Sequence, residues 1–242
     1  MDFDDLERSV DSRTRMIVLC NPHNPVGRVY TEQELARIAD IALRHDLLIF
    51  SDEIHADIVF GGRRHIPFAS IDPEIAKRTI TGLAPSKTFN IAGLKASVIV
   101  ISNNRLKADF DYAQERVFGL YNANTFAIRG LEAAYACGDE WLEQLLPYLE
   151  ENARTTISYL EKETPEIRVT RPEGTFLLWL DFGSLGHSQE ELKTRLHERG
   201  RIALNDGNAF RPNRAGFMRL NIGCPRPRLL DGLGRLKEAV QS

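Results

Sequence analysis

The sequence predicts an α/β protein in which a large domain with a mostly parallel sheet precedes a smaller α/β domain. In the first half of the chain, short apolar runs alternate with helical patterns, which is typical of strands joined by helices. The runs are continuously apolar, as in parallel strands that helices cover on both faces. After a long helical pattern the chain returns to strands, so we place the boundary near residue 140. We therefore expect domains at 1–140 and 141–242, the second including the connecting helix.

The first half contains four apolar runs and three helical patterns. Thr31 and Glu34 form a capping box, which predicts a helix that ends near Arg44. Two further helical patterns cover roughly 105–118 and 124–137. The predicted strands are 16–20, 47–50, 79–83 and 97–101.

The second half begins with one long amphipathic helical pattern over 139–163. Pro147 lies inside it and should kink or split the helix, because proline cannot donate a backbone hydrogen bond. Ser188 and Glu191 form a second capping box for a helix that closes near Gly200. The other predicted elements are strands at 167–170, 175–182 and 216–223 and a last helix at about 227–240.

Composition excludes several classes of protein. With 43% hydrophobic and 27% charged residues, the 242-residue chain is typical of a soluble globular protein. A net charge of −3 gives no electrostatic case for nucleic acid or membrane as partner, and no apolar run is long enough to span a bilayer. The polar N-terminus has no signal-peptide core. Three widely spaced cysteines (Cys20, Cys137 and Cys224) indicate free thiols, no metal site and a reducing cytoplasm.

Three polar side chains follow predicted strands. Asn24, Asp52 and Lys87 each come just after an apolar run, and ligands of parallel sheets bind beyond the carboxyl ends of the strands. Taken singly, each has a simpler interpretation: a turn residue, a helix cap or ion-pair partner, and a solvated lysine. Together they supply what pyridoxal 5′-phosphate (PLP) requires. Its aldehyde needs an amine, its ring nitrogen a carboxylate, and its phenolic oxygen a hydrogen-bond donor.

Four separated motifs carry a family resemblance. NPHNPVG (21–27), SDEIHADIVF (51–60), APSKTFNIAGLKAS (84–97) and GFMRLNIGCPR (216–226) resemble fold-type-I PLP enzymes of the class I/II aminotransferase superfamily. Within it they look most like the MalY/PatB group of cystathionine β-lyase-like C–S lyases. The resemblance implies that 1–140 is part of an aspartate-aminotransferase-like large domain. It also implies that the chain is a C-terminal portion, without the N-terminal part that holds the phosphate-binding loop.

The resemblance assigns the central roles of the site. Lys87 would form the Schiff base with PLP and move the Cα proton of the substrate. Asp52 would pair with the pyridinium nitrogen, and Asn24 would hydrogen-bond the phenolic oxygen. His55 stands where many aminotransferases carry a tyrosine; it either contacts the cofactor or is a histidine satisfied in the wall of the site.

Other residues take peripheral roles by the same resemblance. Ser86 and Lys95 would lie near the phosphate of the cofactor. Lys95 replaces the arginine that is common in aminotransferases, so a bidentate phosphate grip is not expected there. Trp179 is expected in the core. Tyr121 could reach the site, but its spacing from the other motifs does not place it there.

Arg219 is the candidate for binding the α-carboxylate of an amino-acid substrate. Alternation along the strand places Phe217, Arg219 and Asn221 on one face. A guanidinium on an inner strand needs an anion, which is either a substrate carboxylate or an internal Asp or Glu.

These residues predict a PLP-dependent C–S β-lyase that acts on cystathionine or cysteine S-conjugates and releases pyruvate, ammonia and a thiol. The first alternative is a class I/II aminotransferase, which shares the same early chemistry. The second is that the chain as given is catalytically silent, because it has no sequence for a phosphate cradle such as GxGxxG. Family analogy also predicts a homodimer.

Overall fold

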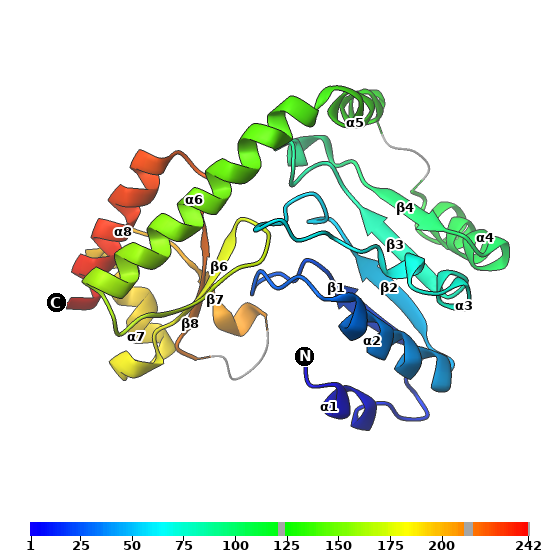
Figure 1. The fold of residues 1–242 in the computed structure, drawn as a ribbon, viewed down its shortest axis with the longest axis horizontal. Coiled ribbons are helices and arrows are strands. Elements are labelled where there is room, and N and C mark those ends of the chain that lie inside the picture. The colour runs from blue at the N-terminus through cyan, green and yellow to red at the C-terminus, as the bar shows by residue number, and fades with distance from the viewer. Residues whose placement is uncertain (121–123, 211–214, 242) are drawn as a thin grey trace. The chain divides into compact units, whose positions relative to one another are not determined.

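The computed structural model describes residues 1–120, 124–210 and 215–241. They fall into two compact units, shown in Figure 1. The first unit comprises Met1–Pro22 and Val29–Leu142, and the second comprises His23–Arg28 and Glu143–Ser242. The segment His23–Arg28 lies within the predicted range 1–140 but packs with the second unit. There the Gly27 carbonyl accepts hydrogen bonds from the backbone N–H groups of Glu173 (2.7 Å) and Gly174 (3.0 Å).

The first unit contains a four-stranded sheet with the order β1-β2-β3-β4. Strands β1, β2 and β3 are parallel, and β4 runs antiparallel to β3, which confirms the prediction of a mostly parallel sheet. Strand β2 extends to Asp52, two residues past its predicted end, because Asp52 still pairs with Cys20 and Gly82. The strands are β1 (Met16–Cys20), β2 (Leu48–Asp52), β3 (Thr79–Leu83) and β4 (Val98–Ile101).

Helix α2 (Glu32–Arg44) covers one face of this sheet. It begins at Thr31, whose side chain accepts from the backbone N–H of Glu34, and the Glu34 carboxylate returns to the Thr31 N–H, so the capping box is confirmed. Its apolar stripe packs against Ile17 and Leu19 of β1 in a buried cluster. The other helices of this unit are α1 (Phe3–Arg8), α3 (Pro73–Ala76), α4 (Asn104–Tyr112, continued by a π-helical turn at Ala113–Val117) and α5 (Thr125–Cys137).

Burial along β1 alternates, which corrects the expectation that helices cover both faces of every strand. Ile17 and Leu19 are 8% and 2% exposed, whereas Val18 between them is 72% exposed. Within the described residues, α2 covers only the side of β1 to which Ile17 and Leu19 point.

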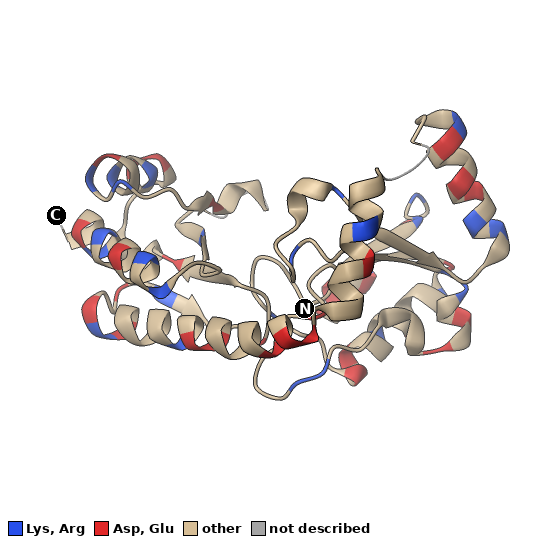
Figure 2. Cartoon of the chain, turned by 90° about the horizontal axis from the view of Figure 1, so that it is seen from above, with Lys and Arg blue, Asp and Glu red and all other residues tan. Residues whose placement is uncertain are grey.

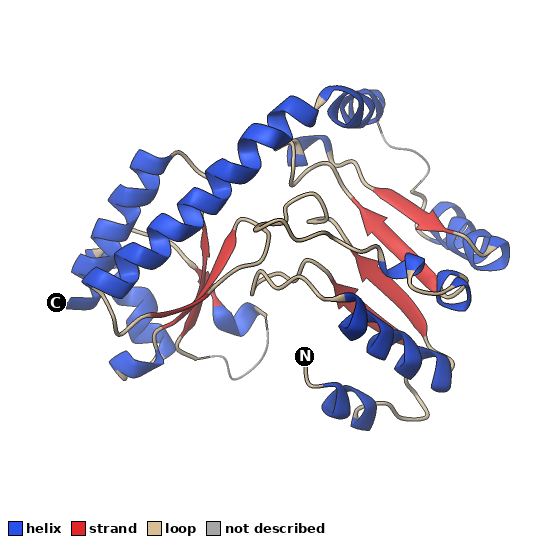
Figure 3. Ribbon diagram, in the orientation of Figure 1, coloured by secondary structure: helices blue, strands red, loops and turns tan. Residues whose placement is uncertain are grey.

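The second unit contains an antiparallel sheet with the order β5-β6-β8-β7. Figure 3 shows the strands of each unit in red. The strands are β5 (Arg168–Thr170), β6 (Leu177–Asp181), β7 (Asn205–Asp206) and β8 (Phe217–Asn221). The helices are α6 (Asp139–Glu163, which belongs to this unit from Glu143 on), α7 (Gln189–Thr194, continued by a π-helical turn at Arg195–Arg199) and α8 (Arg226–Gln241).

Helix α6 is unbroken across Pro147, so of the two expected outcomes, a kink or a split, the split does not occur. A proline inside a helix removes one backbone hydrogen bond. The following turns bury Leu149, Ala153 and Leu160, and this burial holds the helix together beyond the proline.

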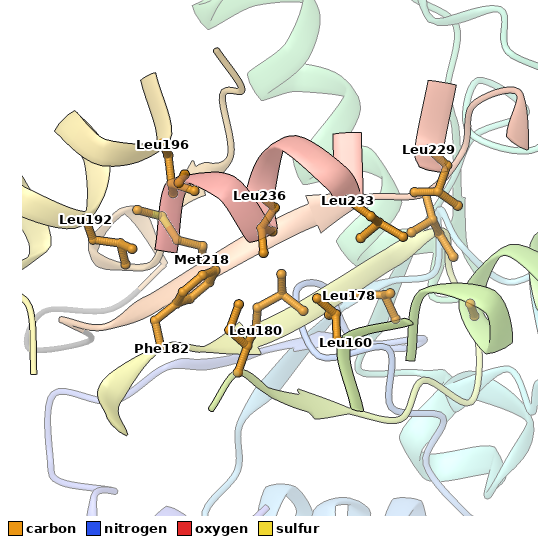
Figure 4. Close-up of a cluster of buried hydrophobic side chains, with 14 residues drawn as sticks. Leu160, Leu178, Leu180, Phe182, Leu192, Leu196, Met218, Leu229, Leu233 and Leu236 are labelled. Carbon is orange, nitrogen blue, oxygen red and sulfur yellow. The ribbon is translucent and has the colours of Figure 1, made fainter. Parts of the chain in front are cut away.

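The core of the second unit forms between α6, α7 and α8 and one face of the sheet, as Figure 4 shows. Leu178 and Leu180 of β6 and Met218 of β8 point into this core. Because strand side chains alternate, Trp179 and its partner Arg219 share the opposite face. The packing of the core therefore determines the side of the sheet on which Arg219 lies.

Charges of both signs are spread over the chain. Figure 2 shows Lys and Arg interspersed with Asp and Glu along the helices, in keeping with the net charge of −3. Among the described residues, no helix is both long and apolar enough to cross a membrane.

Candidate active site

The carboxyl ends of the three parallel strands lie level with one another. The backbone N–H of Asn21 donates to the Asp52 carbonyl at 3.0 Å, and the N–H of Glu53 donates to the Gly82 carbonyl at 2.9 Å. The segments that follow β1, β2 and β3 therefore leave the sheet at one edge, which is where parallel sheets bind ligands.

Asp52 is the last residue of β2, and its side chain is half-buried. Its Oδ1 atom lies 3.4 Å from the backbone N–H of Ile54. The chain then makes successive turns, in which Ala56 N–H donates to the Glu53 carbonyl and Ile58 N–H donates to the His55 carbonyl. His55 lies in these turns and is 2% exposed. The two predicted site residues Asp52 and His55 therefore lie in one short segment at the end of β2.

Lys87 lies in the turn after β3, where Ser86 and Lys87 are half-buried. The next residue, Thr88, is 1% exposed and holds this turn on two sides. Its hydroxyl donates to Asp57 Oδ2 at 2.7 Å, and its carbonyl accepts from the indole N–H of Trp141 at 3.0 Å. The backbone that carries the Lys87 amine is thereby fixed to the turn after β2.

Asp57 and Trp141 were not predicted from the sequence as parts of the site. A signal for Asp57 exists, because it lies five residues after Asp52 in a segment already assigned to the site. Trp141 lies far from Thr88 in sequence, and their contact depends on where α6 begins in the fold.

Lys95 is exposed and follows a short 3-10 turn at Ala92–Leu94. Its backbone has a left-handed conformation with φ of 55°, which is uncommon for a residue with a side chain. A lysine has a flexible stem and no planar guanidinium fork, so this position offers no bidentate grip on a phosphate. Tyr121, the aromatic residue considered from the sequence, lies outside the described residues.

Asn24 and Arg219 are brought together in the second unit. Arg219 Nη1 donates to Asn24 Oδ1 at 2.7 Å, across 195 positions in the sequence. A guanidinium can only donate, so the amide oxygen of Asn24 must face it. The amide NH2 group of Asn24 is then directed away from Arg219 and is able to donate to another group.

The described groups around Arg219 are neutral. Its Nη2 donates to Asn205 Oδ1 at 2.9 Å, and its guanidinium lies 4.8 Å from the centre of the Phe210 ring. Nε of Arg219 is buried and has no hydrogen-bond partner in the part of the chain that the structure describes. Burial lowers the pKa of the Arg219 guanidinium, which is the expected effect of desolvating a cation.

The hydrogen bonds of Arg219 thus go to two amide oxygens rather than to an internal carboxylate among the described residues. This arrangement leaves the cation able to bind an anion. Trp179 is buried, but on the Arg219 side of the sheet, where it stacks on Phe217 with ring centres 5.5 Å apart. Asn205 and Phe210 carry no signal in the sequence, because their contacts depend on how β7 pairs with β8.

Comparisons with known proteins agree with this fold. The profile of the family described as aminotransferase class I and II matches residues 1–236, so the chain belongs to that family. Cystathionine β-lyase PatB of Bacillus subtilis is 41% identical over 241 residues, which are 99% of this chain and 62% of PatB. The predicted resemblance to the MalY/PatB group is therefore confirmed.

Solved structures of PLP-containing proteins share the fold of this chain. A PLP-bound protein of Clostridium difficile, assigned as an aminotransferase, is 45% identical with a TM-score of 0.96 over 99% of this chain and 62% of its own. Cystalysin of Treponema denticola, which contains PLP, is 35% identical with a TM-score of 0.96 over 100% of this chain and 61% of its own. The chain spans about three-fifths of the length of the relatives that it matches.

Proposed function

We propose that this chain is part of a PLP-dependent C–S β-lyase that acts on cystathionine or cysteine S-conjugates. The observation that carries the choice of a lyase is the 41% identity with cystathionine β-lyase PatB over nearly the whole chain. Elimination of the thiol followed by hydrolysis with one water molecule would give a thiol, pyruvate and ammonia. We also propose that the protein is a homodimer, on the fold-level analogy alone.

Several polar groups of the chain suit PLP. Asn24 turns its amide NH2 group away from Arg219, and a phenolic oxygen of the cofactor is an acceptor for such a donor. The Asp52 carboxylate, at the carboxyl edge of the sheet, would accept the N–H of the pyridinium ring. Ser86 and Lys95 would lie near the phosphate, with His55 in the wall of the site.

When bound, PLP supplies an aldehyde for amines and a protonated ring that accepts electrons from Cα. Lys87 Nζ would be the amine that binds the aldehyde and later takes the proton from the substrate Cα. Arg219 would hold the α-carboxylate through the donors that its neutral partners leave available. Holding the carboxylate would orient the substrate for removal of the Cα proton, and the C–S bond then breaks with its electron pair on sulfur.

An aminotransferase is the second candidate, favoured by the 45% identity with the Clostridium difficile protein. It would use the same residues to bind the amino acid and to move the Cα proton. The two differ in the fate of the substrate: a lyase releases pyruvate and thiol from cystathionine alone. An aminotransferase forms a keto acid only when an amino acceptor is added.

The test is to incubate the purified chain with PLP, reduce it with borohydride, and locate the modified lysine by peptide mass spectrometry. We expect a pyridoxyl group on Lys87, and none at the other lysines. Lys87→Arg is the matched variant, because it keeps a cation but cannot form the covalent link, and it should lose the label.

Labelling confined to Lys87 would be followed by a cystathionine assay for pyruvate and thiol. Scattered or absent labelling would contradict cofactor binding by this chain and would support the silent alternative. Turnover of cystathionine without pyruvate would contradict the lyase proposal itself.

A further inference from the structure

A buried carboxylate lies directly beside Asp52 and has no part in the proposed chemistry. Glu53 is 2% exposed. Its Oε1 accepts hydrogen bonds from the Ser51 hydroxyl (2.8 Å) and from the backbone N–H of Phe68 (3.0 Å). Its Oε2 lies 2.7 Å from Nε2 of His65. A buried charge is tolerated only when it is paired and hydrogen-bonded, as this carboxylate is.

His65 completes the arrangement. Its side chain is 10% exposed, and its Nδ1 atom is buried without a hydrogen-bond partner among the described residues. A proton on Nδ1 would be a buried donor with no acceptor, which is costly. The proton therefore belongs on Nε2, from which it is donated to Glu53.

The alternation of side chains connects this cluster to the candidate site. Ser51 and Glu53 point to one side of the chain, and Asp52 between them points to the other. The backbone on either side of Asp52 is also held, by Asn21 N–H to the Asp52 carbonyl and by Glu53 N–H to the Gly82 carbonyl. With Glu53 fixed on the core side, the stretch of backbone from which the Asp52 side chain extends is held in place.

We propose that Glu53 is a positioning residue for Asp52, and that His65 holds Glu53 in place. The proposal rests on the proposed function, since it gives Asp52 the task of holding the PLP ring nitrogen. Glu53 itself would touch neither cofactor nor substrate. The competing interpretation is that Glu53 only ties the loop at Phe68 to the sheet, with no effect on Asp52.

The first test uses the chain without cofactor and compares Glu53→Gln with the original by hydrogen exchange. Glutamine keeps the size of Glu53 and can still accept from Ser51 and Phe68, but its amide N–H group faces His65 Nε2. His65 must then carry its proton on the buried Nδ1. We expect exchange of the Ala56 and Ile58 amides, which close the turns after Asp52, to become about tenfold faster, as for loss of about 1.4 kcal/mol of local stability.

Glu74→Gln is the matched control, because it removes an exposed carboxylate of the same unit that pairs with Lys77. It should leave the exchange of these amides unchanged. Faster exchange at Phe68 alone in Glu53→Gln would overturn the proposal and leave only the loop-tying role.

The second test is a double-mutant cycle on the dissociation constant of PLP, with Asp52→Asn as the other change. If Glu53 acts through Asp52, Glu53→Gln should weaken PLP binding about tenfold in the original chain and less than about twofold beside Asp52→Asn. Equal weakening in both backgrounds would overturn the proposal. If the original chain does not bind PLP, the proposed function fails for this chain, and the exchange experiment still decides the role of Glu53.

Discussion

Arg219 carries a positive charge whose hydrogen-bond acceptors in the described structure are the neutral oxygens of Asn24 and Asn205. A guanidinium forms its strongest contacts with carboxylates, in a two-pronged geometry. Neutral acceptors orient the group without neutralising it. The described acceptors therefore leave the charge of Arg219 available, which supports its proposed role in binding a substrate carboxylate.

We expect Arg219→Ala to weaken binding of an amino-acid substrate roughly 10- to 150-fold, since hydrogen bonds to charged groups contribute about 1.5–3 kcal/mol. Arg219→Lys should restore only part of the affinity, because an ammonium lacks the planar fork. Titration calorimetry of the PLP-loaded protein would measure both. Arg168→Ala, which removes an exposed arginine of β5, is the control. Unchanged affinity in Arg219→Ala would show that Arg219 has a structural role only.

Glu163, at the end of α6, gives the second unit a pH-dependent contact. Its hydrogen bond with the Lys237 ammonium, at 2.8 Å, lowers the pKa of the Glu163 carboxyl below its ordinary value of 4.5. A carboxyl with a lowered pKa in the folded state stabilises the fold above about pH 4.5. That contribution is lost as the pH falls through the lower folded pKa.

Glu163→Gln should therefore reduce the melting temperature at neutral pH and make the loss of stability below pH 4.5 less steep. Melting temperatures measured across the acid range would show it. Glu150→Gln removes an exposed carboxylate from the same helix and should keep the original pH dependence. If the melting temperatures of Glu163→Gln and of the original chain fell equally steeply below pH 4.5, the proposed contribution of the Glu163–Lys237 pair would be contradicted.

At the scale of elements, features that depend on residues close in sequence were predicted well, whereas pairings between distant segments were not. The capping boxes at Thr31 and Ser188 were predicted correctly, because they involve residues three positions apart. Strand β7 was missed, since two residues carry no periodicity and its existence depends on pairing with β8. The contact of Asn24 with Arg219 was missed for the same reason: no spacing rule relates residues so far apart.

Gly27 holds the loop of Asn24 against the rest of the second unit. It has φ of +75°, and a Cβ at this position would lie 2.6 Å from the Pro172 Cβ and 3.0 Å from the Gly174 carbonyl oxygen. Both a left-handed backbone and a close approach of two chain segments therefore require glycine here.

Gly27→Ala should lower the free energy of unfolding by about 2–5 kcal/mol, the sum of left-handed strain and overpacking. Gly62→Ala is the matched control, because Gly62 has φ of +68° but a Cβ added there would meet no atom within 4 Å. Its free energy of unfolding should fall only by the cost of the left-handed strain, about 1–2 kcal/mol. Urea unfolding would measure the difference between the two, and equal losses would contradict the close approach.

At the scale of the whole molecule, the chain matches 62% of the length of PatB. The four motifs were enough to predict the family, because each is short and continuous in sequence, and the continuous apolar runs predicted the mostly parallel sheet. The exposure of Val18 could not be predicted in this way. An apolar run predicts that a strand is buried on both faces. Whether both faces of β1 are covered depends on which helices pack against it, and among the described residues Val18 remains exposed.

We expect copies of the 242-residue chain to associate through strand β1. It lies at one end of the sheet order in the described residues, and Val18 in its middle is 72% exposed. An edge strand with exposed apolar side chains offers both unpaired backbone groups and apolar area to another chain. A lysine at this position opposes such pairing, because burying its charge is costly.

Val18→Lys should weaken self-association of the chain about tenfold or more, since burying a valine contributes roughly 1.5–3 kcal/mol. Folding should be unaffected, because the side chain is already exposed in the single chain. Sedimentation velocity over a range of concentrations would measure the association. Leu230→Lys makes the same kind of change on α8, where the leucine is 42% exposed, and should leave association unchanged. Equal effects of the two lysines would mean that net charge, and not the β1 edge, controls association.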